Sequence, residues 1–192
     1  KHPLKILCGG EALSKKLAGA LLDTGAELWI MYGPTETTVW SSVGRVSESL
    51  LRDCPSVPLG DPIANTQLLV LNRTLSPVPR GVCGQLFIGG EGLATEYLND
   101  PELTSQKFAS SPLLAGKRLY ATGDLVRFDT HGNLLFVGRS DFQVKVRGFR
   151  IELGEVESAV RQATNLEQVV VSAQPIPDSA QDTHLSAHLI QT

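Results

Sequence analysis

The sequence lacks long apolar runs, an excess of basic residues and a metal-site cysteine pattern. No apolar run in its 192 residues approaches the roughly 20 residues that span a bilayer, and its start has no apolar segment of a signal peptide. The 17 basic and 20 acidic residues give a net charge of -3, which disfavours a partner nucleic acid bound through its phosphates. The three cysteines lack metal-ligand spacing, so we expect reduced thiols, a cytoplasmic protein and no membrane partner.

The first forty residues predict a strand, a helix and a second strand. A short apolar run at residues 4–8 ends at two glycines, and leucines then recur at helical spacing after Ser14, a candidate cap. Residues 27–32 predict the next strand. Such β-α-β units usually form parallel sheets with ligands at the carboxyl ends of the strands. The loops after both strands are therefore candidate ligand sites.

The rest of the chain predicts an α+β (mixed α/β) fold. Short strands and turns between residues 57 and 137 predict an antiparallel sheet or small distorted β-barrel. A helix with Val156, Ala159 and Val160 facing inward is expected near the end. Strands are expected at residues 67–71, 84–88, 133–137, 142–146, 168–173 and 184–190. Helices are expected at residues 101–108 and 153–163. A turn is expected at residues 147–148 and a loop at residues 175–182.

One cluster of reactive side chains follows the second strand, at residues 32–38 (YGPTETT). Hydroxyls and backbone N–H groups after a tight turn can hold phosphate oxygens. A carboxylate such as Glu36 can hold Mg²⁺ that bridges to those phosphates. The alternative is a turn and a helix that Thr35 caps.

Two more clusters lie further along the chain. Residues 120–125 (YATGDL) place Asp124 where its oxygens can bind vicinal hydroxyls, as acidic residues bind ribose; an ordinary Asx-turn is the alternative. Residues 138–150 (GRSDFQVKVRGFR) hold four cations, which a phosphate or carboxylate would explain. A solvated charged edge strand is the alternative there.

These clusters occur in order with residues 84–98 (GQLFIGGEGLATEYL) and continue to residue 157 (GRSDFQVKVRGFRIELGEVE). On these motifs the sequence resembles the amino-acid adenylation domain of nonribosomal peptide synthetases, in the adenylate-forming ligase superfamily. The resemblance covers almost the whole chain. The form DFQVKVRG in the last motif resembles peptide synthetases more than acyl-CoA ligases or luciferases.

The resemblance implies ATP-dependent activation of a carboxylic acid to an acyl-adenylate, with release of pyrophosphate. The acyl group would then pass to the phosphopantetheine thiol of a carrier protein. For the phosphates, the resemblance implies that Glu36 holds Mg²⁺ and that Thr35 contacts the α-phosphate. For the nucleoside, it implies that Tyr32, next to Gly33, stacks on adenine, that Asp124 binds the ribose and that Arg139 lies near the ribose and phosphate; the base edge would be lined by Gly10, Glu11 and Ala12. In the small lobe, Asp141 would be the hinge, and Lys145 with the 147–148 turn would face the active site during thioester formation.

Alignment to that family implies that Leu7, Gly9, Met31, Val39 and Trp40 line the amino-acid pocket. Gly9 leaves space, whereas Met31 and Trp40 take space away, so the substrate would be glycine or another very small amino acid. Cysteine-selecting pockets share the tryptophan and remain a rival interpretation. A further alternative makes Trp40 a core residue that points away from the pocket.

The resemblance also implies a division of the chain. Residues 1–140 would be the C-terminal part of the large adenylation lobe, with a sheet and helix layer at 1–45 and the β-barrel at 57–137. Residues 141–192 would begin the small lobe. The family's Ser/Thr/Gly-rich phosphate loop, its substrate-amine Asp and its small-lobe Lys are not found. We therefore expect an internal fragment, inactive alone, that ends at an arbitrary boundary or at an inserted methyltransferase.

The same resemblance implies partners, and it leaves alternative functions open. The implied partners are a carrier-protein domain, which residues 145–150 could approach, and a condensation domain in cis. An acyl-CoA ligase, a nucleotide-binding module without chemistry and a non-catalytic scaffold are the alternatives. A scaffold would not need the charged residues that match the family. Without upstream strands, the sheet piece at residues 4–31 should expose an apolar edge and face.

Overall fold

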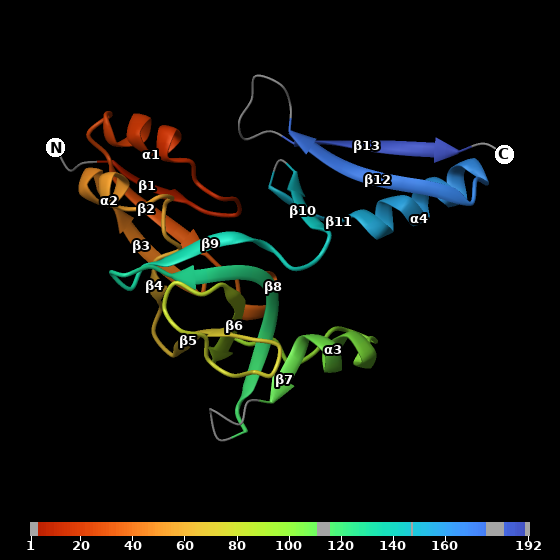
Figure 1. Ribbon diagram of the computed structural model, residues 1–192, viewed down its shortest axis with the longest axis horizontal. Helices are drawn as coiled ribbons and strands as arrows, with labels where there is room; N and C mark the ends of the chain where they lie inside the picture. The colour runs from red at the N-terminus through yellow and green to blue at the C-terminus, as the bar shows by residue number, and fades with distance from the viewer. Residues whose placement is uncertain (1–3, 111–115, 147, 176–182, 191–192) are drawn as a thin grey trace. The chain divides into compact units, whose positions relative to one another are not determined.

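The computed structural model describes residues 4–110, 116–146, 148–175 and 183–190. The chain forms two compact units, Lys1–Ser140 and Asp141–Thr192, and Figure 1 shows the elements of each. The expected loop at 175–182, apart from its first residue, and Arg147 of the expected 147–148 turn lie outside the described residues. Among the described residues, no helix has the length and apolar character that a membrane span requires.

The larger unit begins with the β-α-β arrangement that the sequence predicts. Strands β1 (Lys5–Cys8) and β2 (Glu27–Tyr32) are parallel neighbours. Helix α1 (Lys15–Leu22) connects them, and the Ser14 hydroxyl accepts the Leu17 N–H at 3.2 Å, which confirms the expected cap. The sheet continues with two strands that were not predicted from the sequence, β3 (Ser42–Val46) and β4 (Asp61–Pro62). Helix α2 (Glu48–Asp53), between them in the chain, was not predicted either.

The outer edge of this first sheet is apolar and exposed. Strand β1 is the first strand in the order β1-β2-β3-β4. Leu4 and Leu7 are 68% and 62% exposed, and Leu17 of α1 is also exposed. The exposed edge agrees with the sequence-based expectation. The interior face is instead closed by a cluster of buried side chains: Ala18, Leu28, Ile30, Val46 and Val57.

The second part of the larger unit is a five-stranded, curled antiparallel half-barrel. Its strands are β5 (Thr66–Leu71), β6 (Gly84–Gly90), β7 (Phe108–Ser110), β8 (Arg118–Phe128) and β9 (Leu134–Arg139), with helix α3 (Pro101–Lys107) before β7. Asp124 lies within β8, whose ladder pairs it with Arg139. The Asx-turn alternative for this segment is therefore wrong. The apolar interior consists of Leu59, Val70, Leu86, Ile88, Val126 and Leu134.

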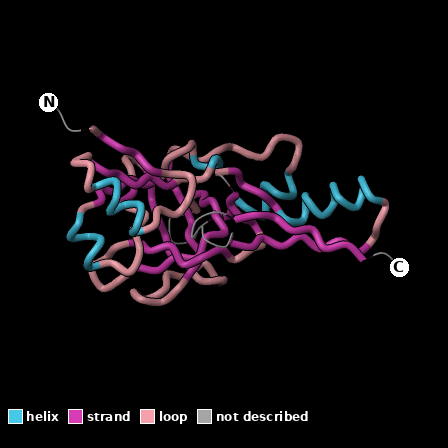
Figure 2. The backbone as a smooth tube through the Cα atoms, turned by 90° about the horizontal axis from the view of Figure 1, so that it is seen from above, coloured by secondary structure: helices cyan, strands magenta, loops and turns pink. Residues whose placement is uncertain are grey.

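The described residues of the smaller unit form two antiparallel strand pairs and one helix. The first hairpin joins β10 (Gln143–Val146) and β11 (Phe149–Glu152), and helix α4 (Leu153–Thr164) follows it. Strands β12 (Gln168–Pro175) and β13 (Thr183–Ile190) pair antiparallel, and Figure 2 shows α4 beside them. Val156 and Val160 are half-buried, as expected. The inward placement of Ala159 was wrong, because its side chain is exposed.

Candidate functional site

The loop that follows β2 is tightly closed. Residues Thr35–Thr37 form one 3₁₀ turn, without a side-chain cap at its start, so the alternative of a helix capped by Thr35 is wrong. The Ser41 N–H donates to the Tyr32 carbonyl at 2.8 Å and so joins the two ends of the loop. A Cβ on Gly33 would lie 2.4 Å from the Val39 carbonyl oxygen. Only glycine allows the chain to fold back this closely.

The far end of the loop holds backbone strain. The Trp40 N–H donates to the Thr38 carbonyl at 2.8 Å, which makes a three-residue γ-turn centred on Val39. Val39 has φ 69° and Thr38 has φ 60°, a left-handed region that β-branched residues rarely adopt. Such strain persists only where surrounding structure holds it, and it is frequent at functional sites. The turn determines where the Trp40 side chain leaves the loop.

Trp40 lies against the end of β1. A Cβ on Gly9 would lie 2.5 Å from two atoms of the indole ring and 2.8 Å from the Met31 carbonyl oxygen. The structure therefore brings together three of the five expected pocket residues, and the Trp40 ring faces Gly9. Val39 is 57% exposed and Leu7 is exposed. Strands β1 and β2 are parallel, and Cys8 pairs with Ile30 near the ends of both strands. The segment that follows β1 therefore begins at the same end of the sheet as Tyr32; it contains Gly10, Glu11 and Ala12.

A buried ion pair joins β8, β9 and the end of β2. Arg139 Nη1 lies 2.6 Å from Asp124 Oδ1, and both side chains are largely shielded from solvent. The Tyr32 hydroxyl donates to Asp124 Oδ2 at 2.5 Å. The Thr122 hydroxyl accepts the Asp124 N–H at 2.9 Å and donates to the Leu86 carbonyl. Three expected nucleotide-site residues, Tyr32, Asp124 and Arg139, therefore form one hydrogen-bonded cluster.

The electrostatics of this cluster keep Tyr32 protonated. Burial, followed by the negative charge and hydrogen bond of Asp124, raises the pKa of Tyr32 well above its usual value, and Arg139 only partly opposes this. Tyr32 thus remains a hydrogen-bond donor to Asp124 near neutral pH. The Tyr32 ring is thereby fixed in orientation at the end of the sheet.

Glu36 has a partner that was not predicted from the sequence. Its side chain is buried, with 8% exposed, and the Tyr97 hydroxyl donates to Glu36 Oε1 at 2.6 Å. Burial and the bond to Glu36 raise the pKa of Tyr97. Tyr97 lies in the motif at residues 84–98, but it is 61 residues from Glu36 in sequence. Its position in that motif was the one available signal.

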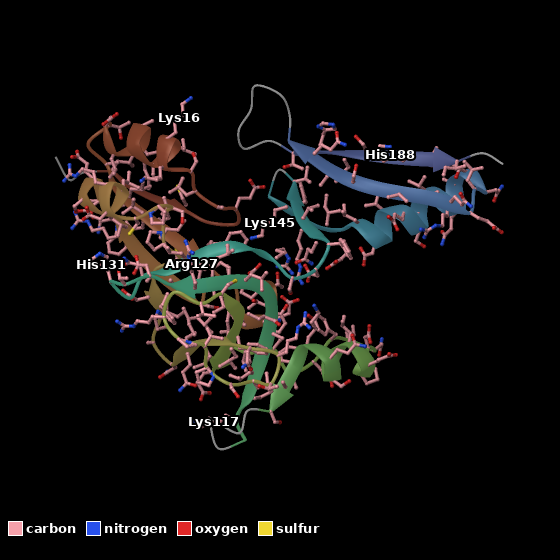
Figure 3. All side chains as sticks on the ribbon, viewed as in Figure 1. Lys16, Lys117, Arg127, His131, Lys145 and His188 are labelled. Carbon is pink, nitrogen blue, oxygen red and sulfur yellow. The ribbon has the colours of Figure 1, made fainter. Side chains whose placement is uncertain are left out.

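The two remaining expected residues belong to the smaller unit. Asp141 Oδ1 accepts the Gln143 N–H at 3.3 Å where β10 begins. Lys145 lies on β10, as Figure 3 shows, and pairs across the hairpin with Arg150. Gly148, at the expected turn, has φ 80°, which glycine adopts readily. The structure therefore places the Asp141 carboxylate and the cations of Lys145 and Arg150 on or beside this hairpin, within their own unit.

The donor set of the larger unit suits a cation shared with phosphate. Among the described residues no group of three or more His, Cys, Asp or Glu side chains could hold a metal ion. Mg²⁺ in nucleotide sites commonly takes one or two carboxylates and completes its shell with water and substrate phosphates. Glu36, buried and fixed at one oxygen, fits such a site. A metal site made of protein ligands alone does not fit.

Comparison with known families agrees with this geometry. A family model described as AMP-binding enzyme matches residues 1–98, half of the chain, and the chain therefore belongs to this family. A linear gramicidin synthase of Brevibacillus parabrevis is 48% identical over 186 residues, which are 96% of this chain and 2% of that protein. A dimodular nonribosomal peptide synthase of Bacillus subtilis (strain 168) is 43% identical over 188 residues, 97% of this chain and 8% of that protein. The chain thus spans a small part of the length of these relatives.

Solved structures give the same relationship. A four-domain nonribosomal peptide synthetase bound to AMP and glycine is 48% identical, with TM-score 0.66, over 95% of this chain and 14% of that one. The Vibrio cholerae adenylation domain AlmE, in complex with glycyl-adenosine-5'-phosphate, is 31% identical, with TM-score 0.82, over 95% of this chain and 35% of that one. The resemblance to adenylation domains of nonribosomal peptide synthetases, and the mixed α+β fold, are thus confirmed.

Proposed function

We propose that this chain is part of an adenylation domain that activates an amino acid with ATP and loads it onto a carrier-protein phosphopantetheine thiol. The main observation in support is the loop after β2, because it joins both candidate sites. Tyr32 at its start bonds Asp124, and Trp40 at its end lies against Gly9. Nucleotide and amino acid would therefore meet across Thr35 and Glu36. Residues 1–140 would belong to the large lobe and residues 141–192 to the small lobe.

Each residue would have a distinct role in adenylate formation. The carboxylate of the amino acid would attack the α-phosphate of ATP and displace pyrophosphate. Thr35 and the cationic Arg139 would stabilise the negative charge that builds on the α-phosphate oxygens. Tyr32 would hold the adenine on its ring face, with residues 10–12 along the base edge, and Asp124 the ribose hydroxyls. Lys145, from the smaller unit, would act in the second half-reaction, with Asp141 as the hinge.

The proposal includes Mg²⁺, held by Glu36. When bound, Mg²⁺ neutralises phosphate charge as pyrophosphate leaves. Burial of Glu36 among protein atoms lowers the local dielectric and strengthens its attraction for a cation. The Tyr97 hydroxyl donates to one carboxylate oxygen and compensates part of the cost of burying that charge.

The proposed substrate is glycine. The side-chain position of Gly9 is filled by the indole of Trp40, which would leave little room for a substrate side chain. Two similar solved structures contain glycine or glycyl-adenylate. Cysteine remains the rival small substrate.

The partners and location are part of the same proposal. A carrier domain would present the phosphopantetheine thiol, and some similar structures contain adenylation and carrier domains together. A condensation domain in cis would use the loaded amino acid. A cytoplasmic location suits the three free cysteines.

The test is amino-acid-dependent ATP–pyrophosphate exchange by the full-length polypeptide that contains these residues. We expect the highest rate with glycine. A higher rate with a bulky amino acid would keep the enzyme class and reject the proposed pocket. A rate that no amino acid raises would reject the proposal in favour of the scaffold, the nucleotide-binding module or the acyl-CoA ligase.

A pair of variants tests the pocket directly. Gly9→Ala should lower exchange with glycine, because the added methyl group collides with Trp40 and with the Met31 carbonyl; such overpacking costs about 1–3 kcal/mol. Trp40→Ala should broaden use toward larger amino acids. The double variant should recover part of the loss, since the ring that meets the new methyl is gone. Unchanged selectivity of Trp40→Ala would reject the pocket assignment.

A further inference from the structure

Tyr97 lies at the end of a loop that is bonded to the Glu36 loop at several points. The Ala94 N–H donates to the Glu36 carbonyl at 2.8 Å. The Thr38 hydroxyl donates to the Gly92 carbonyl at 2.8 Å. A Cβ on Gly92 would lie 3.0 Å from the Thr37 carbonyl oxygen, so the two backbones approach closely. The loop after β6 therefore lies alongside the backbone of the Glu36 loop.

The other side of this loop is held by α3, β7 and β8. Arg118 Nη1 donates to the Ala94 carbonyl at 2.8 Å, and its Nη2 donates to the Thr95 carbonyl. The Arg118 guanidinium lies 4.0 Å from the centroid of the Phe108 ring, a cation–π arrangement. The Tyr97 ring meets Phe108 nearly edge-on at 5.9 Å. Thr104 accepts the Tyr97 N–H at 2.9 Å, so Tyr97 is held at its ring and its backbone.

A tyrosine fixed in this way donates its hydroxyl to the Glu36 carboxylate, and the Tyr120 side chain is a second electrostatic partner of that hydroxyl. The 2.6 Å separation is typical of a charge-assisted O–H···O⁻ bond. The bond constrains the rotation of a carboxylate that would otherwise reorient when a cation arrives. Groups that orient a ligand from behind typically change metal affinity or activity about 10–100-fold when removed.

We propose that Tyr97 is a positioning residue, whose hydroxyl orients the Glu36 carboxylate toward the divalent cation bound with ATP. This inference rests on the proposed adenylation function. Tyr97 would touch neither substrate nor reacting atoms, because it acts through Glu36. Arg118 and Phe108 maintain the position of the loop and ring, whereas the hydroxyl contacts the Glu36 carboxylate itself.

The test is ATP binding by the full-length polypeptide, measured by calorimetry over a series of Mg²⁺ concentrations and again in EDTA. Tyr97→Phe keeps the ring against Phe108 and removes only the hydroxyl. We expect the Mg²⁺ concentration for half-maximal ATP binding to rise about tenfold. ATP affinity in EDTA and the KM for the amino acid should stay within twofold of wild type. An unchanged Mg²⁺ dependence in Tyr97→Phe would overturn the role of Tyr97.

Thr104→Val is the matched control. It also removes one hydroxyl bond to Tyr97, but at the backbone N–H, so it loosens the loop and leaves the carboxylate contact in place. We expect wild-type Mg²⁺ dependence. A shift as large as that of Tyr97→Phe would show a structural effect and overturn the inference.

A double variant separates the two proposals. In a Glu36→Gln background the charged partner is absent, so Tyr97→Phe should cause no further change in Mg²⁺ dependence. A full additional effect would contradict action through Glu36. If the wild type binds ATP without any dependence on Mg²⁺ and shows no exchange, the proposed function falls and this inference falls with it. Normal wild-type behaviour with a silent Tyr97→Phe rejects only the inference.

Discussion

The two units differ in how many of their side chains are buried. In the part of the larger unit that the structure describes, buried apolar residues form three separate clusters. Among the described residues of the smaller unit, only Gln143, Val169 and Val171 are buried, and Phe142 and Phe149 are largely exposed. The larger unit also contains both tryptophans and all three tyrosines. A packed core can fix side-chain geometry, whereas a thinly packed unit opens at lower free-energy cost.

This difference matches the chemistry proposed for each unit. Asp124 and Glu36 are buried and bonded to tyrosine hydroxyls, so their orientation is fixed before a ligand binds. Lys145 lies exposed on a hairpin. A cation that serves only one half-reaction needs to move, and a long flexible side chain on a lightly packed unit suits that role.

The largest expected effect is the loss of the buried ion pair in the larger unit. Asp124→Ala removes the partner of Arg139 and the acceptor of Tyr32, and it should destabilise the larger unit by about 4 kcal/mol. Glu157→Ala in the smaller unit breaks the more exposed pair with Arg161 and also removes the acceptor of the Val171 N–H, and it should cost about 1–2 kcal/mol. Hydrogen exchange measured by mass spectrometry on the 192-residue chain reports each unit separately.

Asp124→Asn is the control for the ion pair, because the amide oxygen can still accept a hydrogen bond while the charge is lost. Its cost should fall between wild type and Asp124→Ala. If Asp124→Ala and Glu157→Ala cost the same, the contrast in burial between the units has no energetic meaning.

The next effect concerns the apolar cores. Leu119 is fully buried in the larger unit and Val169 nearly so in the smaller. Leu119→Ala should cost about 3 kcal/mol, and Val169→Ala about 1–2 kcal/mol. Both tryptophans, Trp29 and Trp40, lie in the larger unit, so urea unfolding followed by tryptophan fluorescence should detect only Leu119→Ala. An equal shift by Val169→Ala would mean that the two units unfold as one.

A smaller, pH-dependent effect should be confined to the larger unit. The pKa of Tyr32 is raised, chiefly by burial and then by Asp124, from a usual value of 10.0. Folding therefore favours the protonated form: its contribution is complete below pH 10 and declines above it, as the unfolded chain loses the proton first. The slope is about 1.4 kcal/mol per pH unit for one such group.

Tyrosinate absorbance and circular dichroism, followed together from pH 9 to 12, test this effect. Tyr32→Phe should make the alkaline decline of the stability curve less steep, and the part that remains should come from Tyr97, whose pKa is also raised. Tyrosinate that appears in full near pH 10 without unfolding would contradict the fixed Tyr32–Asp124 bond.

Local patterns in the sequence predict the elements of this fold better than the contacts between them. The spacing after Ser14 and the apolar runs beside it suffice for β1, α1 and β2. Strand β8 is harder, because Gly123 and Asp124 are typical of turns. They stay in a strand because Arg139 and Tyr32 satisfy the carboxylate. No local pattern could join Tyr97 to Glu36 across 61 residues, since that contact depends on how β6 leads back to the first sheet.

The smallest expected effect tests the smaller unit at its exposed aromatic residues. Phe142 is 86% exposed and Phe149 is 72% exposed, so replacing either ring with serine removes little buried area. Phe142→Ser and Phe149→Ser should each change the free energy of unfolding by no more than about 0.5 kcal/mol, and should reduce self-association of the 192-residue chain. Hydrogen exchange in residues 143–175, with light scattering for association, measures both effects. A cost above about 1 kcal/mol, comparable to that of Val169→Ala, would mean that these rings are buried in solution, and the contrast between a well-packed and a thinly packed unit would no longer hold.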